Sequence, residues 1–110
     1  GSLVTAAAAG AANYTLVLVE NGIYEVTGGQ AVAGRNRVDF AGLATASGFP
    51  TALAFDDLAS WTAAIPTLFR RPGPRFVSLR VEPMLDDYRL PVPKDTPDRL
   101  RRMRAILMEA

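Results

Sequence analysis

The feature that most constrains the fold is a run of apolar and β-branched residues near the start of the chain. Residues 14–20 are Tyr-Thr-Leu-Val-Leu-Val-Glu, with little alternation between polar and apolar side chains. Such a run is typical of a strand that is buried on both faces, as in a parallel sheet covered by helices. An alanine-rich helix is expected before it, over 3–12, and Asn21-Gly22 ends it sharply.

The remainder of the chain alternates between helical and extended patterns. This order predicts a single α/β domain over 1–110, with a mostly parallel sheet, right-handed crossovers and helices on both faces. Pro66 is expected to kink or end the helix that contains it. We expect further helices at 38–48, 57–70 and 98–108, further strands at 51–55 and 75–82, and an extended proline-rich segment at 83–97.

Composition removes several kinds of chemistry. The 110 residues include no cysteine and no histidine, which excludes disulfides, thiol catalysis, thiolate metal sites and the usual general base near neutral pH. The net charge of +1 provides no strong attraction to nucleic acid or to an anionic membrane. We expect a soluble cytoplasmic protein that binds neither, whose chemistry depends on carboxylates, amides, hydroxyls, backbone groups or a cofactor.

The loop after residues 14–20 is the first candidate for function, because ligands of doubly wound sheets bind beyond the carboxyl ends of the strands. The amide oxygen of Asn21 can bind a hard cation, and Gly22 lets the chain turn so that the next carbonyl also points inward. An ordinary Asn-Gly turn explains the same two residues and is the interpretation that the spacing alone favours. The spacing alone leaves both interpretations open.

A longer segment around this loop resembles a known family. Residues 17–30, Val-Leu-Val-Glu-Asn-Gly-Ile-Tyr-Glu-Val-Thr-Gly-Gly-Gln, resemble the second half of the thiamine-diphosphate motif. Within that superfamily they are most similar to phosphonopyruvate and sulfopyruvate decarboxylases, which carry a near-identical Asn-Gly-x-Tyr-Glu-x-Thr-Gly-Gly-Gln run. A looser similarity at 38–40, 55–58 and 72–77 extends the resemblance over most of the chain in one register.

The resemblance implies a three-layer α/β/α domain that binds thiamine diphosphate through Mg²⁺. In the family the metal joins the diphosphate oxygens to an Asp side chain, an Asn side chain and a backbone carbonyl, a set of oxygens that suits Mg²⁺. By resemblance, the metal ligands are the side chain of Asn21 and the carbonyl of Ile23. The implied cofactor-binding residues are Asn21, Gly22, Tyr24, Glu25 and Val26.

One half of the family motif is absent from the sequence. A Gly-Asp-Gly that precedes the Asn in the family has no counterpart here, so the chain resembles an N-terminally truncated domain. The family also needs a pyrimidine-binding domain or subunit, which supplies a catalytic glutamate, and no catalytic residue can be assigned in this chain. The implied function is the thiamine-diphosphate and Mg²⁺-binding part of a 2-oxoacid decarboxylase-like lyase, inactive alone and part of a homo-oligomer. The alternative is a non-catalytic α/β binding or assembly module.

Three other features have a structural and a functional interpretation. Asp56-Asp57 is favoured as a helix N-cap over a carboxylate pair for acid–base chemistry. Trp61 is favoured as a core or interface residue over a ligand platform. A basic cluster on the last helix, favoured as a solvated or subunit-facing surface, consists of Arg99, Arg101, Arg102 and Arg104.

Overall fold

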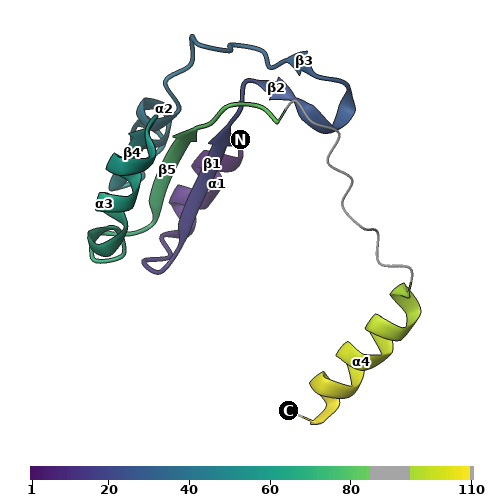
Figure 1. The fold of residues 1–110 in the computed structure, drawn as a ribbon. Helices are drawn as coiled ribbons and strands as arrows, with labels where there is room; N and C mark the ends of the chain where they lie inside the picture. The colour runs from purple at the N-terminus through teal and green to yellow at the C-terminus, as the bar shows by residue number, and fades with distance from the viewer. Residues whose placement is uncertain (85–94, 110) are drawn as a thin grey trace.

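The computed structural model describes residues 1–84 and 95–109, which form an α/β structure with a parallel sheet (Figure 1). A second, two-stranded ribbon lies beyond the end of the first strand. The elements of the described residues are α1 (Ser2–Ala9), β1 (Thr15–Glu20), β2 (Ile23–Tyr24), the 3₁₀ helix η1 (Glu25–Thr27), β3 (Gln30–Ala31), α2 (Phe40–Ala46), β4 (Thr51–Phe55), α3 (Leu58–Leu68), β5 (Arg75–Arg80) and α4 (Thr96–Glu109).

The main sheet has three strands in the order β1-β5-β4, and both pairings are parallel. The central strand is β5, since Arg75 lies opposite Thr15 of β1 on one side and Thr51 of β4 on the other. Parallel strands at 14–20, 51–55 and 75–81 were predicted from the sequence, and the structure confirms them. Among the described residues β1 and β4 are therefore edge strands.

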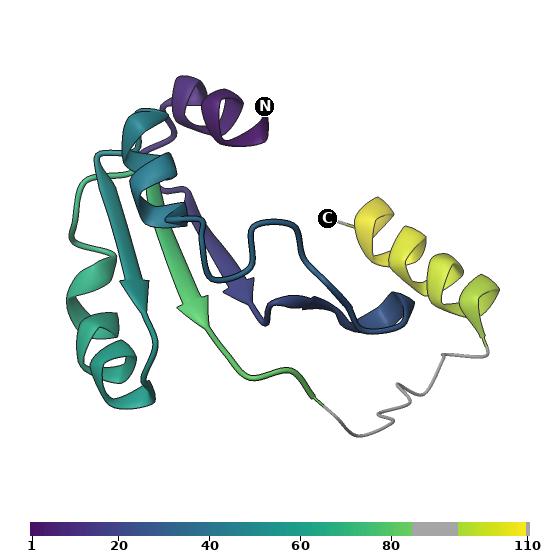
Figure 2. The same cartoon turned by 90° about the horizontal axis from the view of Figure 1, so that it is seen from above.

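The hydrophobic core lies between the sheet and the helices α1 and α2, which lie side by side (Figure 2). Its centre consists of Ala44 of α2, Phe49 and Phe76 of β5, which are 0%, 3% and 1% exposed. The rings of Phe49 and Phe76 meet edge to face at 5.9 Å, a favourable aromatic geometry. Partly buried residues that pack against this centre are Leu3, Ala6, Ala7, Leu16, Leu18, Phe40 and Ala52.

The alternate residues of the strands contact α3 instead of this core. Phe55 of β4 packs against Trp61 of α3, with ring centroids 5.5 Å apart, so the tryptophan has the packing role predicted for it. The strands are most buried at the centre of the sheet, on β5, and β1 is the least buried of the three. Val77 on β5 is fully buried, whereas its neighbour Val17 on β1 is 47% exposed and Val19 is 60% exposed.

A buried arginine holds the end of α3 to the sheet. Arg75 is 7% exposed, and its Nε donates to the carbonyl of Arg71 at 2.8 Å. Its Nη2 donates to the carbonyl of Phe69 at 2.9 Å, and its Nη1 donates to the Thr15 hydroxyl at 3.4 Å. One guanidinium therefore satisfies carbonyls that follow α3 and connects them to β1.

Helix ends differ from the predictions by a few residues, for local reasons. The first helix ends at Ala9 because Gly10 adopts a left-handed conformation, with φ of 63°. The third helix continues past Pro66 to Leu68, although Pro66 has no N–H to donate to the carbonyl of Thr62. The last helix begins at Thr96, which places Pro97 in the first turn, where its missing N–H needs no partner. Residues 85–94 of the predicted proline-rich segment lie outside the described residues.

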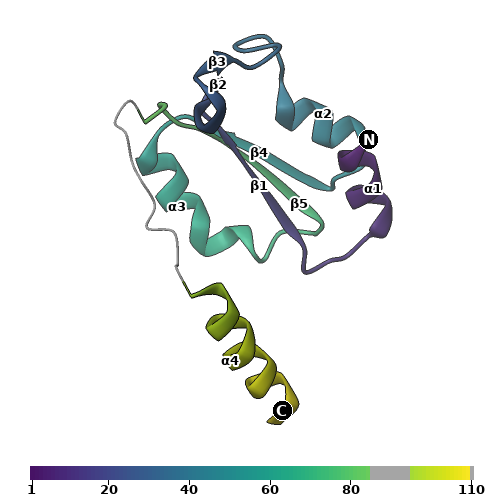
Figure 3. The ribbon, with the colours of Figure 1, turned by 90° about the vertical axis from the view of Figure 1, so that its right-hand side faces the viewer.

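The loop expected after residues 14–20 contains secondary structure of its own, the strands β2 and β3 and the helix η1. Gly28 and Gly29 adopt positive φ values of 117° and 76°, which reverse the chain so that Tyr24 pairs with Gln30 in the antiparallel ribbon β2-β3. The last helix, α4, stands apart from the sheet (Figures 1 and 3). None of the described helices is long and apolar enough to cross a bilayer.

Candidate functional site

A polar cavity of about 370 Å³ opens at the carboxyl edge of the sheet. The three parallel strands all end here, which is where ligands of open α/β sheets bind. Residues at or just after the end of each strand, and residues of the loop after the ribbon, contribute to its wall. The lining residues are Glu20, Asn21, Gly22, Arg35, Asn36, Asp56, Arg80, Val81, Glu82 and Pro83.

Asn21 follows β1 directly and its side chain is fixed within its own loop. The Oδ1 atom accepts a hydrogen bond from the Ile23 N–H at 3.2 Å, and Nδ2 donates to Glu25 Oε2 at 2.8 Å. A carboxamide oxygen has two lone pairs, so Oδ1 retains one acceptor position for a further partner. Asn21 is half-buried at the cavity wall.

Gly22 supports the turn that the sequence predicts at this point. Its φ of 74° lies in the left-handed region that glycine adopts without a steric cost. Its carbonyl accepts the Val32 N–H at 3.1 Å, which ties the start of the ribbon to its end. A side chain at position 22 would also meet the Arg35 side chain above it.

The carbonyl of Ile23 faces away from the ribbon. Backbone groups of successive residues point to opposite sides of a strand, and the carbonyls of Gly22 and Tyr24 both accept N–H groups from the partner side, those of Val32 and Gly29. The Ile23 carbonyl between them therefore lies outside the ladder. It follows Asn21 by two residues, so the structure brings the two predicted metal ligands together at one turn.

The other predicted cofactor residues lie farther out along the loop. Tyr24, Glu25 and Val26 do not line the cavity, and Tyr24 and Val26 are 53% and 99% exposed. Glu25 has a bridging position, since it accepts from Asn21 and from the backbone N–H of Met84. Asn21 and Gly22 therefore line the cavity, and Ile23 is the next residue along the chain. Tyr24, Glu25 and Val26 lie outside the cavity.

Several cavity residues were not predicted from the sequence. Arg35, Asn36, Arg80 and Glu82 line the cavity together with the predicted residues. Their signal is positional, because Arg80 and Glu82 lie at or just after the end of β5, where ligand-binding side chains of parallel sheets gather. Arg35 and Asn36 have no comparable signal, since they reach the edge only through the reversal of the chain in the ribbon.

Asp56 and Asp57 have different roles. Asp57 is the N-cap of α3, and its Oδ1 accepts from the Ser60 backbone N–H at 2.8 Å. Asp56 instead lines the cavity at the end of β4. The prediction of a helix cap is therefore confirmed for Asp57, while its neighbour belongs to the wall of the candidate site.

Both signs of charge occur around the cavity. The Nη2 of Arg80 lies 3.8 Å from Glu20 Oε1, and the Ser78 hydroxyl donates to Glu20 Oε2 at 3.3 Å. The side chain of Arg80 is 56% exposed, so this ion pair is screened by water and its main effect is on orientation. A ligand that combines a cation with an anionic group matches this mixed lining better than a purely anionic one.

The donor atoms at the edge suit Mg²⁺ in kind and supply part of its shell. Mg²⁺ takes six oxygens and keeps several waters, and Asn21 Oδ1 and the Ile23 carbonyl are neutral oxygens of the required type. Within 1–84 and 95–109 the structure has no group of three or more acidic, histidine or cysteine side chains placed to hold a metal. Further oxygen ligands would have to come from water, from the diphosphate and from another segment or subunit.

The chain was compared with protein-family models, with curated proteins and with solved structures, and no match was found in any of the three comparisons.

Proposed function

We propose that the chain is the thiamine-diphosphate and Mg²⁺-binding part of a 2-oxoacid decarboxylase-like lyase of the phosphonopyruvate or sulfopyruvate decarboxylase type. The observation that carries this proposal is the cavity at the carboxyl edge of the parallel sheet, with Asn21 and Gly22 in its wall and the Ile23 carbonyl beside them. The family resemblance assigns its metal ligands to two of these positions. A cofactor of this kind would therefore meet oxygen donors where the sheet leaves room for it.

The arrangement of helices supports the same proposal. Phe76 of β5 packs toward α1 and α2, whereas Phe55 of β4 packs against α3. We propose that these contacts belong to a three-layer α/β/α domain of the thiamine-diphosphate-binding type. In such a domain the diphosphate lies at the carboxyl edge of the strands, which is where the cavity is found.

The chain's own residues would bind and orient the cofactor. Asn21 would bind the metal through Oδ1, and Gly22 keeps the turn compact enough for the Ile23 carbonyl to join it. Arg35 and Arg80 place positive charge where the diphosphate would lie. When bound, thiamine diphosphate supplies the nucleophilic carbon and the electron sink that decarboxylation of a 2-oxoacid requires.

The proposal includes a partner and a cellular setting. A pyrimidine-binding domain or subunit of the same enzyme would supply the catalytic glutamate, and an acidic ligand from outside the described residues would complete the metal shell. We propose a cytoplasmic homo-oligomer in which this chain provides positioning and part of the metal site. Nucleic acid and membranes have no role in it.

A calorimetric titration tests the proposal. Thiamine diphosphate is added to the chain alone and to the chain mixed with a pyrimidine-domain protein from a neighbouring gene, with Mg²⁺ and with a chelator. We expect binding that needs Mg²⁺ and that is tighter in the mixture. Absence of Mg²⁺-dependent binding in both samples would contradict it.

The second candidate is a non-catalytic α/β binding or assembly module that keeps the fold without the chemistry. The absence of a three-residue acidic cluster from the described part of the chain favours it. The same titration decides between the two, since a module without cofactor chemistry gives no Mg²⁺-dependent heat with any partner.

A further inference from the structure

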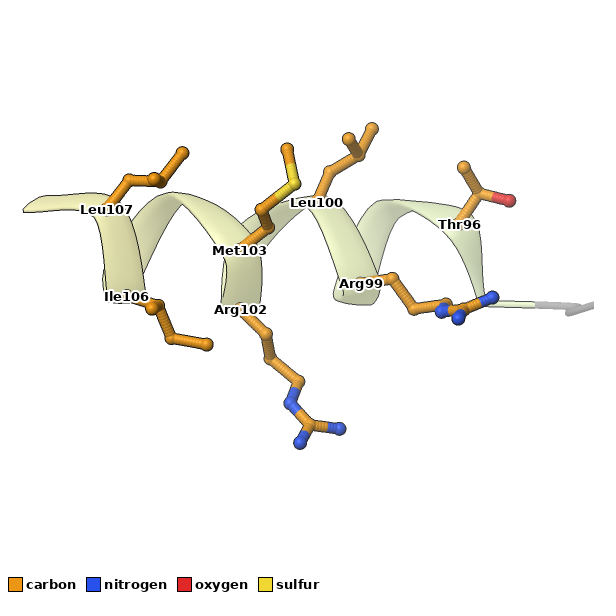
Figure 4. Close-up of a pocket in the computed structure, with 7 residues that line it drawn as sticks. All are labelled: Thr96, Arg99, Leu100, Arg102, Met103, Ile106 and Leu107. Atoms are coloured by element: carbon orange, nitrogen blue, oxygen red, sulfur yellow. The ribbon is translucent and has the colours of Figure 1, made fainter. Parts of the chain in front are cut away.

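The last helix carries an apolar stripe that nothing in the described structure covers. Leu100, Met103 and Leu107 project from one side of α4, at the spacing of residues on one helical face (Figure 4). They are 56%, 54% and 65% exposed. Together with Ile106 on the adjacent side they form an open apolar surface along the helix. We call Leu100, Met103 and Leu107 the α4 stripe.

The parallel sheet has an uncovered apolar area of its own. Val17 and Val19 of β1 are 47% and 60% exposed, although Val77 in the same row is fully buried. The difference arises because α3 contacts β4 and does not extend across the sheet to β1. We call Val17 and Val19 the β1 face. An open apolar face on a parallel strand is unusual, since such strands are covered by helices on both sides.

The two surfaces match in length. The 14 residues of α4 extend about 21 Å. The six residues of β1 extend about 20 Å. A helix of the length of α4 therefore covers the whole of β1, beside α3, in the position that a crossover helix of a parallel sheet occupies.

The charges on the first half of α4 and at the carboxyl edge of the sheet are also complementary. A helix that covers a parallel sheet after a strand normally runs antiparallel to that strand, which would bring the start of α4 to the carboxyl edge. Arg99 and Arg102 lie in this half of α4, and the exposed carboxylates of Asp56 and Glu82 lie at that edge. Glu20, Arg35 and Arg80 lie at the same edge, so its lining holds three carboxylates and two guanidinium groups. The basic side chains that flank the stripe would thus meet an edge with an acidic excess of one charge.

We propose that the α4 stripe docks on the β1 face of a second copy of the chain, so that two copies exchange their C-terminal helices. Each copy has one α4 stripe and one β1 face. A reciprocal exchange with two-fold symmetry covers both surfaces in both copies. The apolar contact itself does not involve the candidate site, because Val17, Val19 and the α4 stripe do not line it, although Asp56 and Glu82 at the carboxyl edge do.

A second copy is favoured over the chain's own sheet because α4 extends away from that sheet in all views (Figures 1–3). Fifteen residues connect β5 to α4. A connection of that length reaches at most about 50 Å, more than twice the length of a strand, so exchange requires no change in the sheet.

Cross-linking of single-cysteine variants separates exchange from internal docking. The chain has no cysteine, so Val17→Cys and Met103→Cys each carry one thiol. We mix the two variants and treat them with a short bismaleimide. A cross-linked species of twice the chain mass, present in the mixture and weak in either variant alone, is expected. Cross-linking only within a Val17→Cys/Met103→Cys double variant, or no cross-linking in either sample, overturns the proposal.

Sedimentation equilibrium at micromolar concentration measures the contribution of the stripe. Leu107→Lys is expected to raise the dimer dissociation constant by about tenfold or more, because it places a charge within an apolar contact. Ala105→Lys adds the same charge on the opposite side of α4 and is expected to change it by less than about twofold. A monomeric parent chain overturns the proposal, as does a monomer that binds phosphatidylserine vesicles through Leu107, which would assign the stripe to a lipid surface.

Discussion

The side chain of Asn21 makes two hydrogen bonds within its own loop, to the Ile23 N–H and to Glu25. Both bonds span four residues or fewer, so the orientation of the amide is determined locally, before any ligand arrives. An amide whose oxygen already has a fixed direction loses little conformational freedom when it binds a metal. The geometry at this residue is therefore compatible both with a simple Asn-Gly turn and with a prepared ligand.

Asn21→Ala distinguishes these two interpretations. In a complex that completes the cofactor site, we expect the variant to weaken Mg²⁺-dependent binding of thiamine diphosphate by roughly 10–100-fold, the usual consequence of losing a group that supports a metal site. Calorimetric titration at several Mg²⁺ concentrations measures this change, and circular dichroism monitors the fold.

Asn13→Ala is the matched control, since Asn13 is exposed and precedes β1 at the opposite edge of the sheet. We expect it to leave cofactor affinity unchanged. Equal affinity in Asn21→Ala and in the parent chain would show that Asn21 is only a turn residue.

Arg75 is a charged residue that the sequence places in a strand without indicating its burial. Arg75→Met keeps the length of the side chain and removes the donors to the carbonyls of Phe69 and Arg71. We expect the free energy of unfolding to decrease by about 1–3 kcal/mol, because two hydrogen bonds from a charged, buried donor are lost. Urea unfolding measures it. Arg70→Met, at an exposed position beside it, is expected to change stability by less than about 0.5 kcal/mol.

At the scale of elements, the cap of α3 links the helix to pH. Hydrogen bonds from the Ser60 hydroxyl, and next from the Ser60 backbone N–H, hold the pKa of the Asp57 carboxyl below its ordinary value. A carboxylate whose folded pKa is lowered contributes stability above its unfolded pKa, and loses that contribution as the pH falls through the folded value. The cap is therefore expected to weaken in acid, below about pH 4.

Asp57→Asn tests this, because asparagine caps a helix without titrating. We expect the urea midpoint of the parent chain to decrease more between about pH 6 and pH 3 than that of the variant. Asp56→Asn leaves the cap of α3 in place and should retain the pH dependence of the parent. If both variants show the parent's decrease, the carboxylate of Asp57 does not stabilise the helix through its charge.

The sequence predicts the elements with strong periodicity and misses those that depend on backbone conformation. The apolar run at 14–20 and the extended pattern at 75–82 correspond to β1 and β5, and the alternation of elements predicts their parallel pairing. The ribbon β2-β3 is not predicted, because its pairing depends on positive φ values at glycines and on no hydrophobic pattern. The same is true of the residues that line the cavity. Asn21 is predicted from its place after a strand, whereas Arg35 is not predicted.

At the scale of the whole molecule, the proposed function needs metal ligands that the described residues do not supply in one cluster. We expect the chain alone to decarboxylate no 2-oxoacid, because a metal that dehydrates reluctantly lacks a nearby acidic cluster. Coupled assays with phosphonopyruvate, sulfopyruvate and pyruvate measure this, with a mock purification as control. Turnover above that control would show that the chain contains a complete active site.

The order of the strands has a consequence for synthesis. The central strand β5 is the last of the three to be made, and its partners β1 and β4 begin sixty and twenty-four residues earlier. While the ribosome adds the intervening residues, β1 and β4 have no neighbour in the main sheet to pair with. Contacts this distant in sequence also form slowly. A nascent chain that ends before Arg75 thus exposes two apolar strands with unpaired backbone, so this interval of translation is when the protein most needs a chaperone.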